Sequence, residues 1–193
     1  MNFIEIGSND YDTLLSSKYF SKTSWGIIVE PVKKYFDNLP IIENVQYLNY
    51  AITANKDGIQ KFYEPIDHPN PEWVKSIGSL KCDHPTLKEL NISKQTVETT
   101  VNAMSLQNFY NFIPEDNIHF LKIDAEGTDF ELLENWDFIK FKPMHIQFES
   151  KLMSTEELNI IIEKLKKENY IVTKAIKKDY AGRAYNHIAQ LEF

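Results

Sequence analysis

The chain has 193 residues, of which 42% are apolar and 13% aromatic, which suits one compact domain over residues 1–193 and argues against a disordered chain. With 21 basic and 28 acidic residues its formal charge is −7, which excludes general nucleic-acid binding and disfavours a polyanionic ligand. The single cysteine, Cys82, excludes an internal disulfide and a thiolate metal cage. Neither a signal peptide nor an apolar run of about 20 residues is present, so we expect a soluble, cytoplasmic protein without membrane binding.

Short apolar runs alternate with amphipathic stretches, which is typical of an α/β fold with helices covering a sheet. The elements predicted in the first half are strands at residues 3–7, 25–30 and 45–51, helices at residues 13–20 and about 32–38, and an added antiparallel strand at residues 60–63. Residues from about 65 to 95 carry four prolines and no sustained periodicity. We predict an irregular excursion there that serves as an acceptor-binding loop or packs on the surface.

The second half continues the alternation. The strands predicted there lie near residues 97–101 and at 118–124, 145–149, 170–173 and 185–193. Helices are expected to begin at Ser105, at the capping box of Thr128 with Glu131, and at the capping box of Ser154 with Glu157. Asn169 is the expected C-cap of the last helix, and the last two strands are expected to form a hairpin with a turn near Gly182.

Acidic residues gather where the first two strands end. Glu5-Ile6-Gly7-Ser8-Asn9-Asp10 follows the first strand, and Glu30-Pro31 ends the second. In an open α/β sheet ligands bind at these carboxyl ends, and a carboxylate there can accept hydrogen bonds from a ribose, as in nicotinamide dinucleotides or S-adenosylmethionine. The first turn also carries Asp12, and Tyr11 replaces a glycine that a pyrophosphate would require. The carboxylates of this turn would repel phosphate and attract a sulfonium and an ammonium group. This pattern favours S-adenosylmethionine as the ligand.

Four segments carry a resemblance to a known family, namely F-I-E-I-G-S-N-D, G-I-I-V-E-P, N-Y-A-I-T and I-H-F-L-K-I-D-A-E-G-T-D-F-E-L-L. In these segments the sequence resembles the FkbM family of class I S-adenosylmethionine-dependent methyltransferases, and K-I-D-x-E-G is the specific piece. The likeness runs from Phe3 to about Glu149. The resemblance implies a Rossmann-like fold, with helices on both faces of a seven-stranded, mostly parallel sheet that ends in an antiparallel hairpin. It also implies methyl transfer, most often to a hydroxyl of a sugar or a secondary metabolite.

Two departures from the family pattern affect the cofactor pocket. Tyr11 stands where the family usually has glycine, which would narrow the methionine end of the pocket. The first strand begins almost at the initiator, without the N-terminal helices that often cover the cofactor. We therefore expect an open pocket, or one closed by a second copy of the chain or by a partner domain.

The residues expected to hold the cofactor come from the ends of four strands. Asn49 and Ala51 are expected near the adenine, Glu30 on the ribose, and residues 7–10 around the methionine moiety. The full expected set is Glu5, Gly7, Ser8, Asn9, Asp10, Glu30, Pro31, Asn49, Ala51 and Asp124.

Asp124 is the leading candidate for the catalytic base or acceptor-orienting group, because it ends a strand where the reacting atoms would lie. Glu149, at the end of a neighbouring strand, is the second candidate. Lys122 shares a face with Asp124, so it is either a catalytic residue or the partner that neutralises a structural carboxylate. Asp124 and Glu149 could also hold Mg²⁺. His84 follows Cys82 in the excursion, but one thiol without a second cysteine pair argues against a zinc site.

The sequence thus predicts an S-adenosylmethionine-dependent O-methyltransferase acting on a hydroxyl of a saccharide, a glycan or a small metabolite. Two alternatives stay open at this point. One is a nicotinamide-dependent oxidoreductase, which the acidic turn and Tyr11 disfavour. The other is a catalytically degenerate domain that binds cofactor and serves as a partner module.

Overall fold

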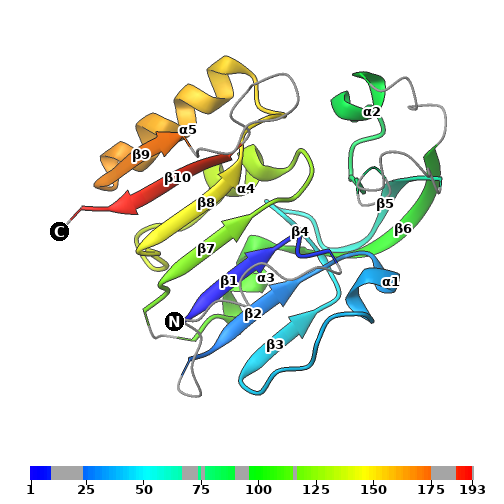
Figure 1. The fold of residues 1–193 in the computed structure, drawn as a ribbon, viewed down its shortest axis with the longest axis horizontal. Helices are drawn as coiled ribbons and strands as arrows, with labels where there is room; N and C mark the ends of the chain where they lie inside the picture. Colours follow the sequence, from blue (N-terminus) through cyan, green and yellow to red (C-terminus); the bar gives the residue numbers. More distant parts are fainter. Residues whose placement is uncertain are drawn as a thin grey trace.

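The central feature of the computed structural model is a seven-stranded sheet with the strand order β3-β2-β1-β7-β8-β10-β9 (Figure 1). The structure describes residues 1–9, 24–66, 74, 77–89, 96–114, 117–174 and 186–192. The strands are β1 (Phe3–Ile6), β2 (Gly26–Val29), β3 (Val45–Leu48), β7 (Phe120–Ile123), β8 (His145–Glu149), β9 (Tyr170–Lys174) and β10 (Asn186–Leu191). The first five in chain order pair in parallel, whereas β10 is antiparallel to both of its neighbours. The predicted α/β fold with a terminal antiparallel hairpin is confirmed.

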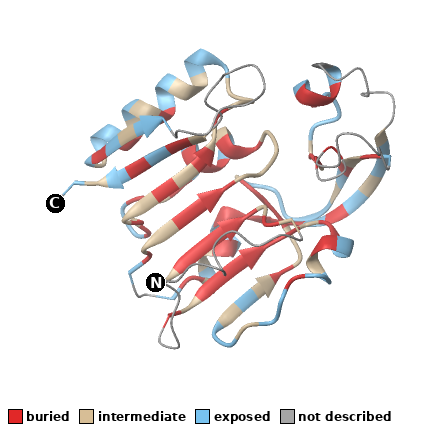
Figure 2. Cartoon of the chain, viewed as in Figure 1, coloured by how far each residue is buried: buried red, intermediate tan, exposed pale blue. Residues whose placement is uncertain are grey.

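Helices cover both faces of this sheet, and Figure 2 shows that its central strands are buried. All four residues of β1 and of β2 are buried, as expected for parallel strands covered on two sides. On one face, the side chains of Ile4, Ile27 and Ile123 pack in a cluster with residues of α3 (Leu106–Phe109), α4 (Asp129–Asn135) and α5 (Thr155–Lys167). On the other face, Phe3 and Ile28 pack with Phe36 of α1 (Lys33–Phe36).

A second, three-stranded sheet lies beyond the carboxyl ends of the central strands, on the side to which the arrowheads of β1, β2 and β7 point (Figure 1). It consists of β4 (Ala51–Thr53), β6 (Thr96–Ser105) and β5 (Gly58–Pro65), in that order. The expected single strand at residues 45–51 is therefore wrong, because the chain leaves the central sheet after Leu48. Asn49 explains the break, since its side-chain amide donates hydrogen bonds to the carbonyls of Glu30 (2.8 Å) and Pro31 (3.0 Å).

The predicted helix caps had mixed outcomes. The Ser154–Glu157 capping box is confirmed, with both reciprocal hydrogen bonds formed. Thr128 and Ser105 precede helices as expected, but neither side chain caps. Both hydroxyl groups bind other partners instead. The Thr128 hydroxyl donates to the Ala125 carbonyl, and the Ser105 hydroxyl donates to the Asp57 carboxylate. The C-cap of α5 is Glu168, one residue before the expected Asn169. Asn169 directly follows the cap and has a φ of +65°.

Several expectations concern parts of the chain that the structure does not describe. These are the helix at residues 13–20, the turn near Gly182, and the roles of Asp10, Tyr11 and Asp12. Within the excursion, the described residues include a short helix, α2 (Pro85–Glu89), and Ser79, which pairs with Tyr63 of β5. No described helix is both long enough and apolar enough to cross a membrane.

The capping box of α5 allows a direct test of local stability. The Ser154 hydroxyl accepts a hydrogen bond from the Glu157 amide (3.2 Å), and the Glu157 carboxylate accepts one from the Ser154 amide (2.7 Å). We expect Ser154→Ala to lower the free energy of unfolding by about 1 kcal/mol, measured by urea denaturation. Ser154→Asp, which keeps an acceptor oxygen, is the matched control, and equal stability of Ser154→Ala and the wild type would refute the role of the cap.

Candidate functional site

The turn after β1 packs directly against the loop that follows β7. Gly7 has a φ of +82°, and a Cβ atom built on it would lie 1.9 Å from the carbonyl oxygen of Asp124. The Asp124 amide in turn donates a hydrogen bond to the Ile6 carbonyl (2.9 Å). Only glycine combines this backbone conformation with so close an approach, so the two loops meet with no side chain between them.

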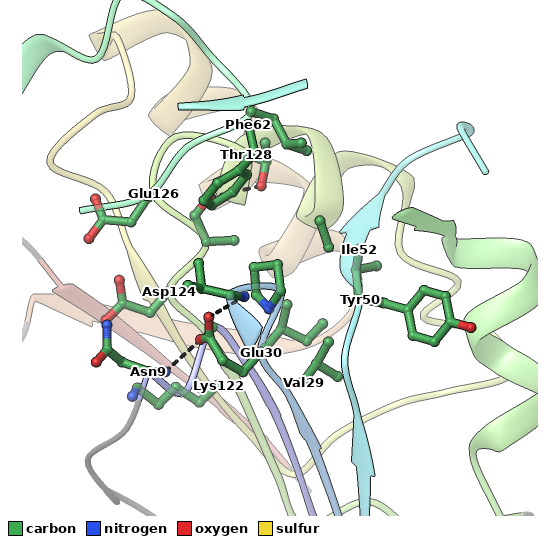
Figure 3. Close-up of a pocket in the computed structure, with 18 residues that line it drawn as sticks. Asn9, Val29, Glu30, Tyr50, Ile52, Phe62, Lys122, Asp124, Glu126 and Thr128 are labelled. Atoms are coloured by element: carbon green, nitrogen blue, oxygen red, sulfur yellow. Dashed lines mark hydrogen bonds between the residues drawn. The ribbon is translucent and has the colours of Figure 1, made fainter. Parts of the chain in front are cut away.

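Glu30 connects the end of β2 to the same turn. Its carboxylate accepts hydrogen bonds from the Asn9 amide (2.7 Å) and from the Val32 amide (2.8 Å), and both bonds are drawn in Figure 3. Asn9 has a φ of +56°, which an asparagine tolerates better than most residues. The buried Glu30 carboxylate is therefore held in one position by the backbone on both sides of it.

These loops line a cavity at the carboxyl ends of β1, β2 and β7, with an empty volume of about 750 Å³ that is partly open to solvent (Figure 3). Ile52 and Phe62 from the second sheet complete its wall. The expected site residues that the structure brings together along this wall are Gly7, Asn9, Glu30, Pro31, Ala51, Lys122 and Asp124.

Among the described residues, three of those expected to hold the cofactor do not line the cavity. Ser8 is buried, and the side-chain amide of Asn49 donates hydrogen bonds to the carbonyls of Glu30 and Pro31. Glu5 lies inside the sheet, 1% exposed, where its carboxylate pairs with the ammonium group of Lys122 at 2.8 Å. The glutamate thus neutralises a buried lysine on the neighbouring strand rather than lying at the rim of the sheet.

Four carboxyl groups crowd the loop after β7 and the end of β8, and each has a raised pKa. Burial raises the pKa of Asp124, against the opposing effect of Lys122. Burial and the charges of Asp124 and Asp129 raise the pKa of Glu126 well above its usual value. Burial and Asp124 raise the pKa of Asp129 to about 7. Burial and the other three carboxylates raise the pKa of Glu149 to about 10.

Glu149 lies at a separate, smaller cavity with an empty volume of about 240 Å³. Asp129 shares this cavity, and among the described residues neither Asp129 Oδ1 nor Glu149 Oε2 has a hydrogen-bond partner. In the described part of the chain, no three acidic, histidine or cysteine side chains are placed to hold a metal ion. The expectation that Asp124 and Glu149 hold Mg²⁺ therefore finds no support.

Glu126 and His84 form a contact that the sequence did not predict. His84 Nε2 lies 3.1 Å from Glu126 Oε2, and the Ser79 hydroxyl donates to the Glu126 carbonyl (2.7 Å). Burial lowers the pKa of His84 to about 4, so its imidazole is neutral at physiological pH. Nothing in the local sequence signals this pairing, because His84 lies 42 residues away in the excursion.

A comparison with protein families identifies the family of the chain. The family described as Methyltransferase FkbM domain matches residues 5–172. The chain belongs to the FkbM methyltransferase family. It is therefore an S-adenosylmethionine-dependent methyltransferase. No curated protein matches the chain in sequence.

A comparison with solved structures finds similar chains, of which one reaches a TM-score of 0.50. An O-methyltransferase from Bacillus cereus in complex with SAH superposes with a TM-score of 0.50 at 14% identity, over 99% of this chain and 74% of that one. A precorrin-6y C5,15-methyltransferase from Geobacter metallireducens GS-15 has a TM-score of 0.46 at 11% identity, over 99% of this chain and 80% of that one. At these identities the similarity concerns the fold alone.

The residues of the cavity suit the cofactor of a methyltransferase. Gly7 lets the turn after β1 pack against the Asp124 backbone at the wall of the cavity, and Glu30 places a fixed carboxylate at the same wall. The remaining carboxylates at the wall, Asp124 and Glu126, match a positively charged sulfur better than a phosphate. The individual roles of these residues stay predictions.

The raised pKa of Glu149 predicts how the stability of the methyltransferase depends on pH. Between about pH 4.5 and 10 the folded state keeps a proton on Glu149 that the unfolded state has lost, so stability falls as the pH rises. Glu149→Gln removes this titration and should raise the free energy of unfolding at pH 8 by more than about 1 kcal/mol, with a smaller gain at pH 5.

Urea denaturation at the two pH values measures this difference. Glu163→Gln, which changes an exposed carboxylate on α5, is the control and should show no gain at pH 8. An equal effect of Glu149→Gln at both pH values would mean that Glu149 is not protonated in the folded state.

Proposed function

We propose that this methyltransferase acts in the cytoplasm on a hydroxyl group of a saccharide, a glycan or a small metabolite. The observation that supports this most is the pair of carboxylates, Asp124 and Glu126, that line the cavity and have raised pKa values. A carboxylate of raised pKa is a stronger base, and a hydroxyl acceptor must lose its proton during methylation. The family resemblance points to the same class of acceptor.

The cofactor is proposed to lie along the ends of β1 and β2. Glu30 would accept hydrogen bonds from the ribose hydroxyls, since its carboxylate is held in place by two backbone amides. Gly7 and Asn9 would surround the methionine moiety, and Ala51 would lie near the adenine. When bound, S-adenosylmethionine supplies a methyl group on a positively charged sulfur, which keeps the bonding electrons when the methyl leaves.

The protein's own contribution is to hold the acceptor in line and to take its proton. Positioning alone can lower a barrier by about 7–11 kcal/mol, and a placed base adds about 10²–10⁴-fold in rate. The acidic wall would also select against acceptors that carry phosphate or carboxylate close to the reacting hydroxyl, because like charges repel in a site of low dielectric constant.

Glu30→Gln tests the proposed ribose contact. An amide in place of the carboxylate loses one acceptor oxygen and the charge, so the dissociation constant for S-adenosylmethionine should rise at least about tenfold. Isothermal titration calorimetry measures this, with Glu163→Gln as a distant control that should bind like the wild type. Unchanged affinity in Glu30→Gln would place the ribose elsewhere.

The class of acceptor is tested with methyl-labelled S-adenosylmethionine and a panel of neutral saccharides, small alcohols, amines and carboxylic acids. We expect labelled product with hydroxyl acceptors, and no binding of NAD⁺ in a parallel titration. Transfer only to nitrogen or carboxylate acceptors, or to none of the panel, contradicts the proposed function.

A further inference from the structure

Glu126 adopts a conformation that its surroundings must maintain. It has a φ of +44°, in the left-handed region that a glutamate rarely occupies. Such a conformation costs on the order of 1–3 kcal/mol and persists where neighbouring groups over-determine it, most often at functional sites. The residue lies two positions after Asp124 and lines the same cavity.

Two side chains from the excursion hold Glu126 in place. Ser79 fixes its backbone through the carbonyl, and His84 lies at hydrogen-bond distance from its carboxylate. Ser79 is itself anchored to the second sheet, since its backbone exchanges two hydrogen bonds with Tyr63 of β5 (2.8 and 3.1 Å). The contacts that hold Glu126 therefore come from residues of the excursion, of which Ser79 is anchored to the second sheet, and not from the loop after β7 that carries Glu126.

The orientation of the pair leaves the carboxylate accessible. The His84 side chain is only 2% exposed, whereas the Glu126 side chain keeps 27% exposure. A neutral imidazole with its proton on Nε2 donates to Glu126 Oε2, and the buried Nδ1 has no hydrogen-bond partner among the described residues. His84 contacts only Oε2 of Glu126. Oε1 therefore stays available to an acceptor.

Asp124 and Glu126 occupy different positions around the cavity. Figure 3 shows the Asp124 side chain beside Asn9, on the side of the β1 turn, and the Glu126 side chain apart from it. Gly7, at the same turn, packs on the Asp124 carbonyl. In the proposed function this turn holds the methionine moiety of the cofactor, so Asp124 lies beside the cofactor and Glu126 lies farther along the loop, toward the second sheet.

We infer that Glu126, rather than Asp124, accepts the proton of the acceptor hydroxyl, and that His84 and Ser79 are positioning residues that aim its carboxylate. This inference rests on the proposed function. The proton moves from the acceptor oxygen to Glu126 Oε1, and the acceptor oxygen keeps the electron pair that bonds to the methyl carbon.

The charges around Glu126 support this role. Burial, Asp124 and Asp129 raise the pKa of Glu126, whereas Lys151 lowers it, and His84 is neutral. The positive sulfur of a bound cofactor would favour the ionised carboxylate when the acceptor enters, so that Glu126 becomes a competent base at that stage.

The test compares Glu126→Gln, His84→Gln and His84→Ala with a matched control, Glu131→Gln. Glu131 is a nearby carboxylate that also contacts the excursion, through Lys81 at 3.3 Å, but it does not line the cavity. We expect Glu126→Gln to lower kcat about 10²–10⁴-fold with the hydroxyl acceptor found in the panel. His84→Ala should lower kcat at least about tenfold, His84→Gln should restore most of it through its amide N–H, and Glu131→Gln should match the wild type.

Two further readouts do not depend on turnover. The affinity for S-adenosylhomocysteine, measured by calorimetry, should change less than about threefold in all four variants, which separates proton transfer from cofactor binding. Nitrogen-15 NMR of the wild type should show His84 with a protonated Nε2, whose shift moves in Glu126→Gln and not in Glu131→Gln.

Wild-type turnover in Glu126→Gln, or an unprotonated Nε2 of His84 in the wild type, would overturn the inference and leave the proposed function intact. If the wild type binds S-adenosylmethionine and methylates no hydroxyl acceptor, the proposed function is wrong and the assignment of the base is wrong with it.

Discussion

The contact between the turn after β1 and the loop after β7 determines where everything else in the site can lie. Gly7 and the Asp124 carbonyl are so close that no side chain fits between them, and the Asp124 amide returns a hydrogen bond to Ile6. The end of β2 is connected to the same turn, because the Glu30 carboxylate accepts a hydrogen bond from the Asn9 amide. Three strand ends are thereby joined, by backbone contacts between the β1 turn and the β7 loop and through the Glu30 carboxylate at the end of β2.

This arrangement gathers negative charge at a cost in stability. Asp124, Glu126, Asp129 and Glu149 all have raised pKa values, which means that their ionised forms are less stable here than in water. A fold selected only for stability would replace such a cluster with apolar or paired residues. A positively charged cofactor offsets part of the repulsion when it binds, and mass action then stabilises the folded protein. We therefore interpret the cluster as part of the proposed function.

Much of the fold could be predicted because its signals are local. The buried runs Phe3–Ile6 and Gly26–Val29 and the capping box at Ser154 each depend on residues adjacent in sequence or within one helical turn. The break after Leu48 could not be predicted, since Asn49 is held by carbonyls at the end of another strand. The same reason explains why His84 was missed: its partner, Glu126, becomes a neighbour only when the second sheet folds over the carboxyl ends of the first. Glu5 was misplaced because its partner, Lys122, comes from another strand.

The central claim is that the cavity at the ends of β1, β2 and β7 is where cofactor and acceptor meet. A crystal structure of the complex with S-adenosylhomocysteine tests it most directly. The account predicts ribose hydroxyls within hydrogen-bond distance of the Glu30 carboxylate, and the sulfur facing the space between Asp124 and Glu126. A nucleoside bound outside this cavity, for example in the separate cavity lined by Lys34, Asn49 and Asn102, would contradict the account.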